Sequence, residues 1–250
     1  MAKIYKGPGP VTEEDHEQTE KPHSLPAKVT RKRKMAVGSY VAGPWAEDYK
    51  RLQQNIIGAL LPDVNPRTLL FTSVSDGEGS ETIVSRFGLV LAASGEQVLL
   101  VDTHLRDPVL HQIFSIEQAP GTTELLSGRR TLTEVIHRTA LDGLLLIPGG
   151  SPVADPFFFQ ELETLDAATN VMKAFADWII FSCPPINTYN DAAALAGLVN
   201  GVVLVIQAEK TRWEVAQSAK ERLEKAGANI LGVVLNDRRH HIPGWIYRRL

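Results

Sequence analysis

The chain has 250 residues, of which 44% are hydrophobic and 22% charged, and its net charge is −3. This length and apolar content suffice for one α/β core with some chain to spare, and the small negative charge excludes an overall basic field of the kind that binds nucleic acid. The single cysteine, Cys183, excludes a disulfide within one chain. No apolar run approaches the ~18 residues that span a bilayer, and no signal peptide is recognisable. We therefore expect a cytoplasmic protein, with a place at the inner face of the cytoplasmic membrane left open.

The N-terminal segment, residues 1–37, mixes prolines and glycines with charged residues and has no sustained apolar period. Such a sequence cannot bury enough surface to offset its ordering entropy, so we predict that it is disordered. From Trp45 to Leu61, apolar residues recur every three or four positions, which predicts an amphipathic helix. We place one domain at residues 38–237 and a basic, aromatic tail at residues 238–250.

The rest of the domain alternates between apolar, β-rich runs and helical patterns. Strands are predicted at Thr68–Ser73, Gln97–Asp102, Leu144–Pro148, Trp178–Ser182, Gly201–Gln207 and Ile230–Asn236. Helices are predicted from the first loop to about Gly95, and at Thr122–Ser127, Leu132–Arg138, Phe158–Ala176, Asp191–Leu198 and Arg212–Ala226. Near-continuous apolar strands predict a doubly wound α/β fold, with a mostly parallel sheet covered by helices on both faces. Ligands of such sheets bind at the carboxyl ends of the strands.

The loop after the first strand carries the strongest functional signal. It reads Ser73-Val-Ser-Asp-Gly77-Glu78-Gly79-Ser80-Glu81-Thr82. A strand, a glycine turn and a helix start form the layout of a phosphate-binding loop, where backbone N–H groups and the helix dipole favour an anion. A working loop continues Gly-Lys-Ser/Thr, with the lysine on the phosphates and the hydroxyl on Mg²⁺. Here Ser80 and Glu81 hold those positions, so Gly77, Gly79 and Thr82 retain only part of a phosphate nest.

Motifs in the other loops carry a resemblance to a known family. They include Asp102-x-x-Leu-Arg106-x-Pro108, Pro120-Gly121, Pro148-Gly-Gly, Pro184-Pro185, Asn190-Asp191, Lys210-Thr211-Arg212 and Leu231-Gly-Val-Val-Leu-Asn236. Over about Trp45–Asn236 the chain resembles the bacterial tyrosine autokinase family of capsule and exopolysaccharide synthesis. It is more distantly similar to the division-site and chromosome-partitioning ATPases.

The resemblance implies a P-loop NTPase-like fold and, as a partner, a membrane chain-length-determinant protein, the polysaccharide co-polymerase. It also implies homo-oligomers formed through a Glu-x-x-Arg-x-x-Arg motif on the helix before the domain. Here that motif reads Glu47, Lys50 and Gln53, with its charge reduced. Asn236 matches the family's adenine-side position.

The departures from the family pattern fall on catalytic positions. The second motif, Asp-x-Asp-x-Arg in the family, is here Asp102, His104 and Arg106. The third motif carries Ser182 in place of the acid that organises Mg²⁺. The family's kinases end in a tyrosine cluster, whereas this tail holds only Tyr247.

Losing these charges removes what phosphoryl transfer needs, because its catalysis is positioning plus electrostatic stabilisation. A Glu81 carboxylate ~4 Å from a phosphate costs about 4 kcal/mol at an effective dielectric constant of 20, which weakens nucleotide binding roughly a thousandfold. We predict a catalytically inactive structural or regulatory component with a vestigial site, weakened ATP and Mg²⁺ binding, no required cofactor and no metal. The alternative is an active tyrosine autokinase or ATPase in which His104, Arg106 or Arg86 replaces the lost groups. A ParA-like positioning protein is disfavoured, since that class needs the same lysine and acid.

Three smaller features leave two interpretations open. Glu78 or Glu81 fills the positive helix N-terminus as an internal anion, or Glu81 faces solvent. His104 and His111 lack a third ligand in the sequence, so ordinary histidines are favoured over a metal site. Cys183 is interpreted as a buried residue rather than a nucleophile.

The C-terminal tail is the last of the candidate contact regions. Its aromatic and basic residues either form a peripheral contact with a membrane surface or pack back onto the domain; they are Trp245, Tyr247, Arg248 and Arg249.

Overall fold

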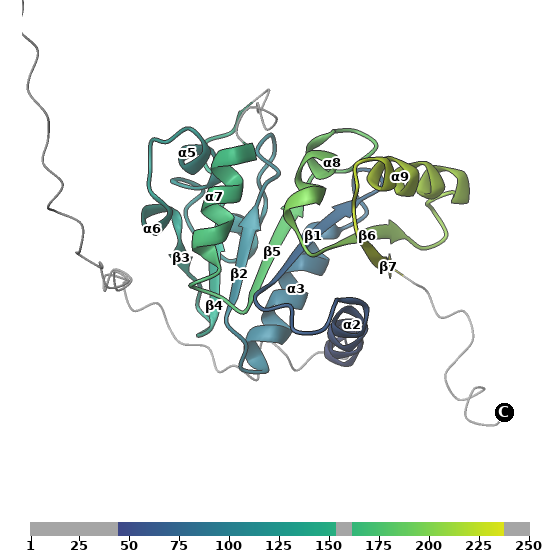
Figure 1. Ribbon diagram of the computed structural model, residues 1–250, viewed down its shortest axis with the longest axis horizontal. Coiled ribbons are helices and arrows are strands. Elements are labelled where there is room, and N and C mark those ends of the chain that lie inside the picture. Colours follow the sequence, from purple (N-terminus) through teal and green to yellow (C-terminus); the bar gives the residue numbers. More distant parts are fainter. Residues whose placement is uncertain (1–44, 154–161, 238–250) are drawn as a thin grey trace, which may run out of the picture.

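The computed structural model describes residues 45–153 and 162–237 (Figure 1). Within them the chain forms a seven-stranded sheet in the order β3-β4-β2-β5-β1-β6-β7. The strands are β1 (Arg67–Ser73), β2 (Val98–Asp102), β3 (His137–Arg138), β4 (Leu144–Ile147), β5 (Trp178–Cys183), β6 (Gly201–Gln207) and β7 (Ile230–Asn236). All pairings are parallel except that of β3 with β4. This confirms the predicted mostly parallel, doubly wound α/β sheet.

Helices cover both faces of this sheet. They are α2 (Ala46–Ala59), α3 (Ser80–Ala93), α4 (Leu110–Ile113), α5 (Thr122–Leu126), α6 (Leu132–Val135), α7 (Leu162–Met172), α8 (Asp191–Leu195), the 3₁₀ turn η1 (Ala196–Leu198) and α9 (Trp213–Lys225). One apolar cluster lies between the sheet and α2, α3 and α4. A second joins the other face to α5, α6, α7, α8 and α9. The central strands β1, β2, β4 and β5 are buried almost throughout, as their continuous apolar sequences require.

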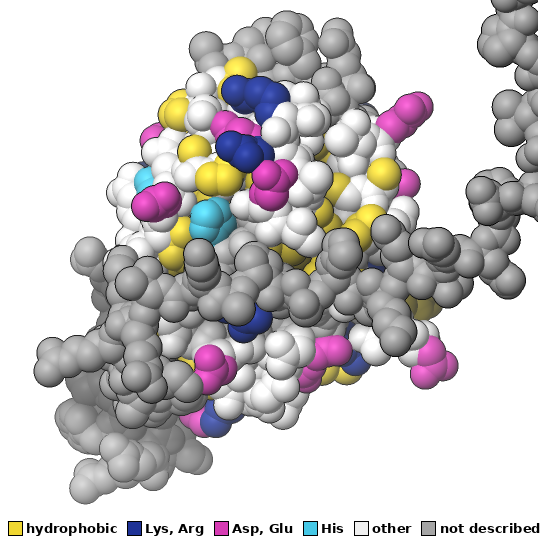
Figure 2. Space-filling model, turned by 90° about the vertical axis from the view of Figure 1, so that its left-hand side faces the viewer, with side chains coloured by type: hydrophobic (Ala, Val, Ile, Leu, Met, Phe, Trp, Pro, Cys, Tyr) yellow, Lys and Arg dark blue, Asp and Glu magenta, His cyan; other side chains and the backbone are white. Residues whose placement is uncertain are grey.

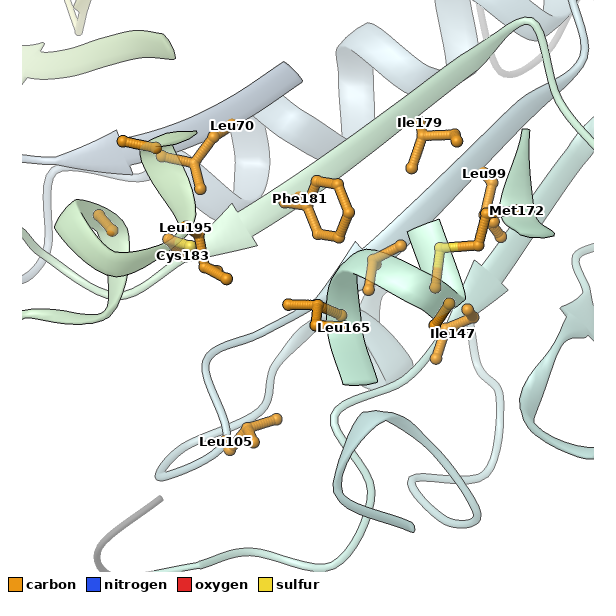
Figure 3. Close-up of a cluster of buried hydrophobic side chains, with 14 of the residues drawn as sticks. Leu70, Leu99, Leu105, Ile147, Leu165, Met172, Ile179, Phe181, Cys183 and Leu195 are labelled. Atoms are coloured by element: carbon orange, nitrogen blue, oxygen red, sulfur yellow. The ribbon is translucent and has the colours of Figure 1, made fainter. Parts of the chain in front are cut away.

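Figure 3 shows the centre of the second cluster. Phe181 projects from β5 among side chains of neighbouring strands, and Leu165 and Met172 of α7 close over them. Cys183 belongs to the same cluster and is 1% exposed. The predicted burial of Cys183 is confirmed, and this burial raises the pKa of its thiol.

Two local predictions were wrong. The helix predicted at Leu132–Arg138 ends at Val135, and His137–Arg138 instead form β3, antiparallel to β4. The cause is that Ile136 takes an extended conformation and is buried, so the chain leaves the helix to fill the core. The short helix α4 was not predicted, because four residues give no readable period.

Other predictions fall partly or wholly outside the described residues. Disorder of residues 1–37, the tail 238–250 and the first residues of the helix predicted at Phe158–Ala176 belong to this group. In residues 45–153 and 162–237, no helix is both long and apolar enough to cross a membrane.

Candidate functional site

The loop between β1 and α3 has the backbone of a phosphate-binding loop. Gly77 and Gly79 have φ angles of 75° and 79°, a left-handed conformation that favours glycine. Gly79 is the N-cap residue of α3 and makes no side-chain cap. The loop therefore presents the start of a 14-residue helix at the carboxyl end of β1, where a parallel sheet places its ligands.

Glu78 holds this loop in place from inside. Its side chain is buried, and one carboxylate oxygen accepts hydrogen bonds from the N–H groups of Val74 at 2.7 Å and Ser75 at 3.1 Å. The other oxygen accepts a hydrogen bond from the Thr211 hydroxyl at 2.5 Å. The carboxylate thus binds amides at the beginning of the loop. The hypothesis that Glu78 fills the helix N-terminus is wrong, because its oxygens are engaged before the helix begins.

Asn236, at the end of β7, fixes the other side of the same loop. Its side-chain amide donates to the carbonyl of Glu78 at 2.8 Å. A Cβ atom at Gly79 would lie 2.6 Å from that amide nitrogen, so the approach requires glycine. The family's adenine-side position thus serves here as a support of the loop.

The positions that carry charge in a working loop are occupied differently. Ser80 is 1% exposed, and its hydroxyl has no hydrogen-bond partner among the described residues. Glu81 is partly exposed, and one carboxylate oxygen lies 4.0 Å from Nδ1 of His104, beyond hydrogen-bond distance. Thr82, the next residue, is exposed.

His104 does not supply a cation at this place. Burial lowers its pKa, and this outweighs the opposite effect of the neighbouring carboxylates of Glu81, Asp107 and Asp76. Its Nδ1 has no hydrogen-bond partner in the described part of the chain. The imidazole is therefore neutral at neutral pH.

Asp102 ends β2 and is 1% exposed. Burial raises its pKa to about 7, although hydrogen bonds from the N–H groups of Leu110, His104 and Val109 favour the charged form. Its partners are all backbone groups of the loop that follows β2. Asp102 thus organises that loop.

Ser182 lies opposite Asp102 in the register of β5 with β2. The Ser182 side chain is 1% exposed, and its hydroxyl, like that of Ser80, has no partner among the described residues. Its backbone carbonyl accepts hydrogen bonds from the N–H and the hydroxyl of Thr103. A hydroxyl here cannot hold a Mg²⁺ shell as a carboxylate does.

Arg106, on the loop after β2, is bound to residues that follow β5. Its guanidinium donates to both carboxylate oxygens of Asp191 at 3.0 and 3.1 Å, and it stacks 4.2 Å from the ring centre of Tyr189. Arg86, on α3, faces α2, with its guanidinium carbon 5.4 Å from the ring centre of Trp45. Neither arginine is a free cation at the loop.

The structure thus brings together residues from three strand ends: the β1 loop, Asp102 and His104 after β2, and Ser182 at the end of β5. No group of three metal-ligating residues occurs within residues 45–153 and 162–237. Sequence reasoning missed the roles of Thr211, Tyr189 and Asp191. Thr211 and Asp191 belong to motifs that the sequence displays, but only the folded chain shows which side chains they contact.

The candidate oligomerisation residues lie on α2, well apart from this site. The Lys50 ammonium is 2.8 Å from the Glu47 carboxylate, one turn earlier on the same helix, and both are exposed. Gln53 follows one turn later and is partly exposed.

No protein-family model matches the sequence. The chain is 33% identical over 171 residues to the tyrosine-protein kinase CpsD of Streptococcus agalactiae, which covers 68% of this chain and 75% of CpsD. It is 29% identical over 194 residues to the tyrosine-protein kinase YwqD of Bacillus subtilis strain 168, covering 78% of this chain and 81% of YwqD.

Solved structures agree with these relatives. The chimerical protein CapA2B2 superimposes with a TM-score of 0.75 at 26% identity, covering 81% of this chain and 91% of that one. The kinase domain of the Escherichia coli tyrosine kinase ETK gives a TM-score of 0.75 at 23% identity, covering 87% of each chain. The septum site-determining protein MinD of Pyrococcus horikoshii, complexed with Mg-ADP, superimposes with a TM-score of 0.58 at 21% identity. The match covers 73% of this chain and 76% of MinD, and it shows a shared fold alone. With its motifs in order, its P-loop fold and a third of its aligned residues identical to CpsD, the chain belongs to the bacterial tyrosine autokinase family.

Proposed function

We propose that this chain is a catalytically inactive member of the family, acting as a structural or regulatory component of capsule or exopolysaccharide synthesis and export. The observation that carries the proposal is the contrast within one loop. Its backbone is held by Glu78, Thr211 and Asn236, while Ser80 and Glu81 stand where the lysine and the Mg²⁺-binding hydroxyl belong.

The charges around the loop support the proposal. Phosphoryl transfer needs cations that neutralise the transferred group. Here Glu81 contributes a carboxylate at the start of α3, the neutral His104 contributes no charge, and the paired Arg106 is held by Asp191. The three candidates for a substitute cation are therefore neutral or engaged elsewhere, since Arg86 packs against Trp45.

We extend the proposal to partners. By family resemblance, the chain pairs with a membrane chain-length-determinant protein at the inner face of the cytoplasmic membrane. Homo-oligomers through α2 are part of the same proposal. The Glu47–Lys50 pair keeps both charges within one helix, so this contact is expected to be weaker than in relatives with the complete motif.

Turnover tests the proposed function. Purified full-length protein is incubated with MgATP, and both phosphate release and phosphotyrosine, at Tyr247 above all, are measured. We expect neither to exceed the level of the same preparation without Mg²⁺. The His104→Ala variant is the matched control. Turnover by the native protein that this variant loses would contradict the proposal and favour an active kinase with an atypical site.

A further inference from the structure

The edge strand β7 carries an uncovered apolar face. Val233 is 55% exposed and Leu235 49% exposed, whereas the side chains of β1, at the middle of the sheet, are buried almost throughout. In the register of β6 with β7, these two residues lie beside Leu204 and Ile206. Leu204 and Ile206 belong to the core cluster on the α9 side. Val233 and Leu235 therefore face the same side of the sheet as α9.

Helix α9 packs on this side of the sheet and contacts both α8 and β7, yet Val233 and Leu235 remain exposed beside it. Its buried residues, Ala219 and Leu223, pack on the core, and Arg222 donates a hydrogen bond at 2.6 Å to Asn190 at the start of α8. Trp213 lies nine residues before Arg222, so at 3.6 residues per turn it lies on the flank of α9 opposite Arg222. Trp213 is 74% exposed. We call Trp213, Val233 and Leu235 the β7 face; Figure 1 shows α9 above the β6–β7 edge of the sheet.

The edge itself is open as well. In the described residues no strand lies beyond β7, so its outer backbone groups form no sheet ladder there. The opposite edge is protected in another way. There β3 has only two residues, and Figure 2 shows charged side chains of both signs mixed over that side of the domain. An apolar edge strand without such protection is a site where another segment or chain can bind.

We propose that the chain's own tail, residues 238–250, covers the β7 face. The tail continues directly from the end of β7, where Asp237 has a φ angle of 55° and so turns the chain out of the strand direction. Thirteen residues reach up to roughly 40 Å when extended, and seven-residue β7 needs about 23 Å. The tail can therefore turn and return along the whole strand.

The composition of the tail fits this place. It contains Ile242, Trp245, Ile246, Tyr247 and Leu250, which are apolar or aromatic and include strong β-formers. A Pro243-Gly244 pair, a sequence typical of turns, lies between Ile242 and Trp245. Its four arginines can keep their charged groups in water while the apolar residues cover the β7 face. Thirteen residues cannot form a core of their own, so their apolar groups gain most by covering an apolar surface that is already built.

Hydrogen exchange tests the proposal. Three full-length or near-full-length proteins are compared: the native chain, a chain ending at Asp237, and a Trp245→Ser/Ile246→Ser variant that keeps the tail's length. We expect the exchange rates of the β7 amides to be at least about tenfold lower in the native chain than in either variant. Amides of β1, in the middle of the sheet, are expected to be unchanged, which shows that both variants remain folded.

Each other outcome overturns the proposal. Equal exchange of β7 in all three proteins would mean that the tail does not cover the strand. Protection that disappears on dilution would assign the face to a second copy of the chain. Protection that arises only with vesicles containing anionic lipid, and is lost with the tail, would place Trp245 and Tyr247 at a membrane surface instead.

Discussion

Replacing Glu78 with alanine is expected to lower the free energy of unfolding by roughly 2 to 4 kcal/mol, because buried donors lose a charged acceptor. The N–H groups of Val74 and Ser75 and the hydroxyl of Thr211 all donate to this one buried carboxylate. When it is removed, the Val74 N–H keeps only its longer hydrogen bond to the Val205 carbonyl at 3.2 Å, and the Ser75 N–H and the Thr211 hydroxyl keep no acceptor among the described residues. Urea unfolding followed by far-ultraviolet circular dichroism measures the change.

The neighbouring Glu81 provides a matched control. It lies on the first turn of α3, is partly exposed, and lies 4.0 Å from Nδ1 of His104, beyond hydrogen-bond distance. Glu81→Ala is therefore expected to change stability by about 0.5 kcal/mol or less. Thr211→Val keeps the side-chain shape but removes the donor to Glu78 and the acceptor of the Gln207 N–H, and its effect should fall between the other two. Equal effects of Glu78→Ala and Glu81→Ala would show that Glu78 does not hold the loop.

Stability is expected to fall as the pH rises from 4.5 to 7 because of Asp102. Burial raises the pKa of Asp102 from 3.8 to about 7 in the folded protein. Between these values the folded state keeps a proton that the unfolded state has released, so raising the pH favours unfolding. The free energy of unfolding is expected to fall by at most about 1.4 kcal/mol per pH unit, and by roughly 3 kcal/mol in total between pH 4.5 and 7. The stabilising contribution is complete below the unfolded pKa and is lost as the pH passes the folded one.

The Asp102→Asn variant isolates this effect. Asparagine cannot titrate, and its side-chain oxygen can still accept the two hydrogen bonds from the N–H groups of Val109 and Leu110, which share one Asp102 oxygen. The variant is expected to be less stable overall, so the comparison rests on slopes. Unfolding free energies are measured at half-unit steps of pH for both proteins. Parallel curves would mean that Asp102 titrates in the folded protein at its ordinary pKa.

Much of the fold could be predicted from the sequence because each strand of the buried sheet is a continuous apolar run. The bounds predicted for β6 and β7 coincide with the structure, and the helix predicted from Trp45 to Leu61 is found as α2, Ala46–Ala59. The predictions failed where packing decides between conformations. Ile136 leaves a helical pattern because its side chain fills the core, and Val233 and Leu235 of β7 stay about half exposed although the apolar run predicts a buried strand.

The candidate site could be located but not described in detail. Sequence spacing identifies Ser80, Glu81 and Ser182 as replacements, since the family's motif fixes their places. It does not reveal that Glu78 binds the start of its own loop or that Asn236 supports the loop from the far strand. Glu78 also binds Thr211, 133 positions away, and Asn236 lies 158 positions from Glu78, so no local pattern encodes these two contacts.

The central claim is that the phosphate-binding loop keeps its backbone and has lost its charges. The most direct measurement is a calorimetric titration of the native protein with MgATP and MgADP, beside a Ser80→Lys/Glu81→Ser/Ser182→Asp variant. We predict no binding at micromolar protein for the native chain and a gain of roughly a thousandfold in affinity for the variant, because a repulsion of about 4 kcal/mol is removed. Micromolar binding by the native chain would contradict the claim.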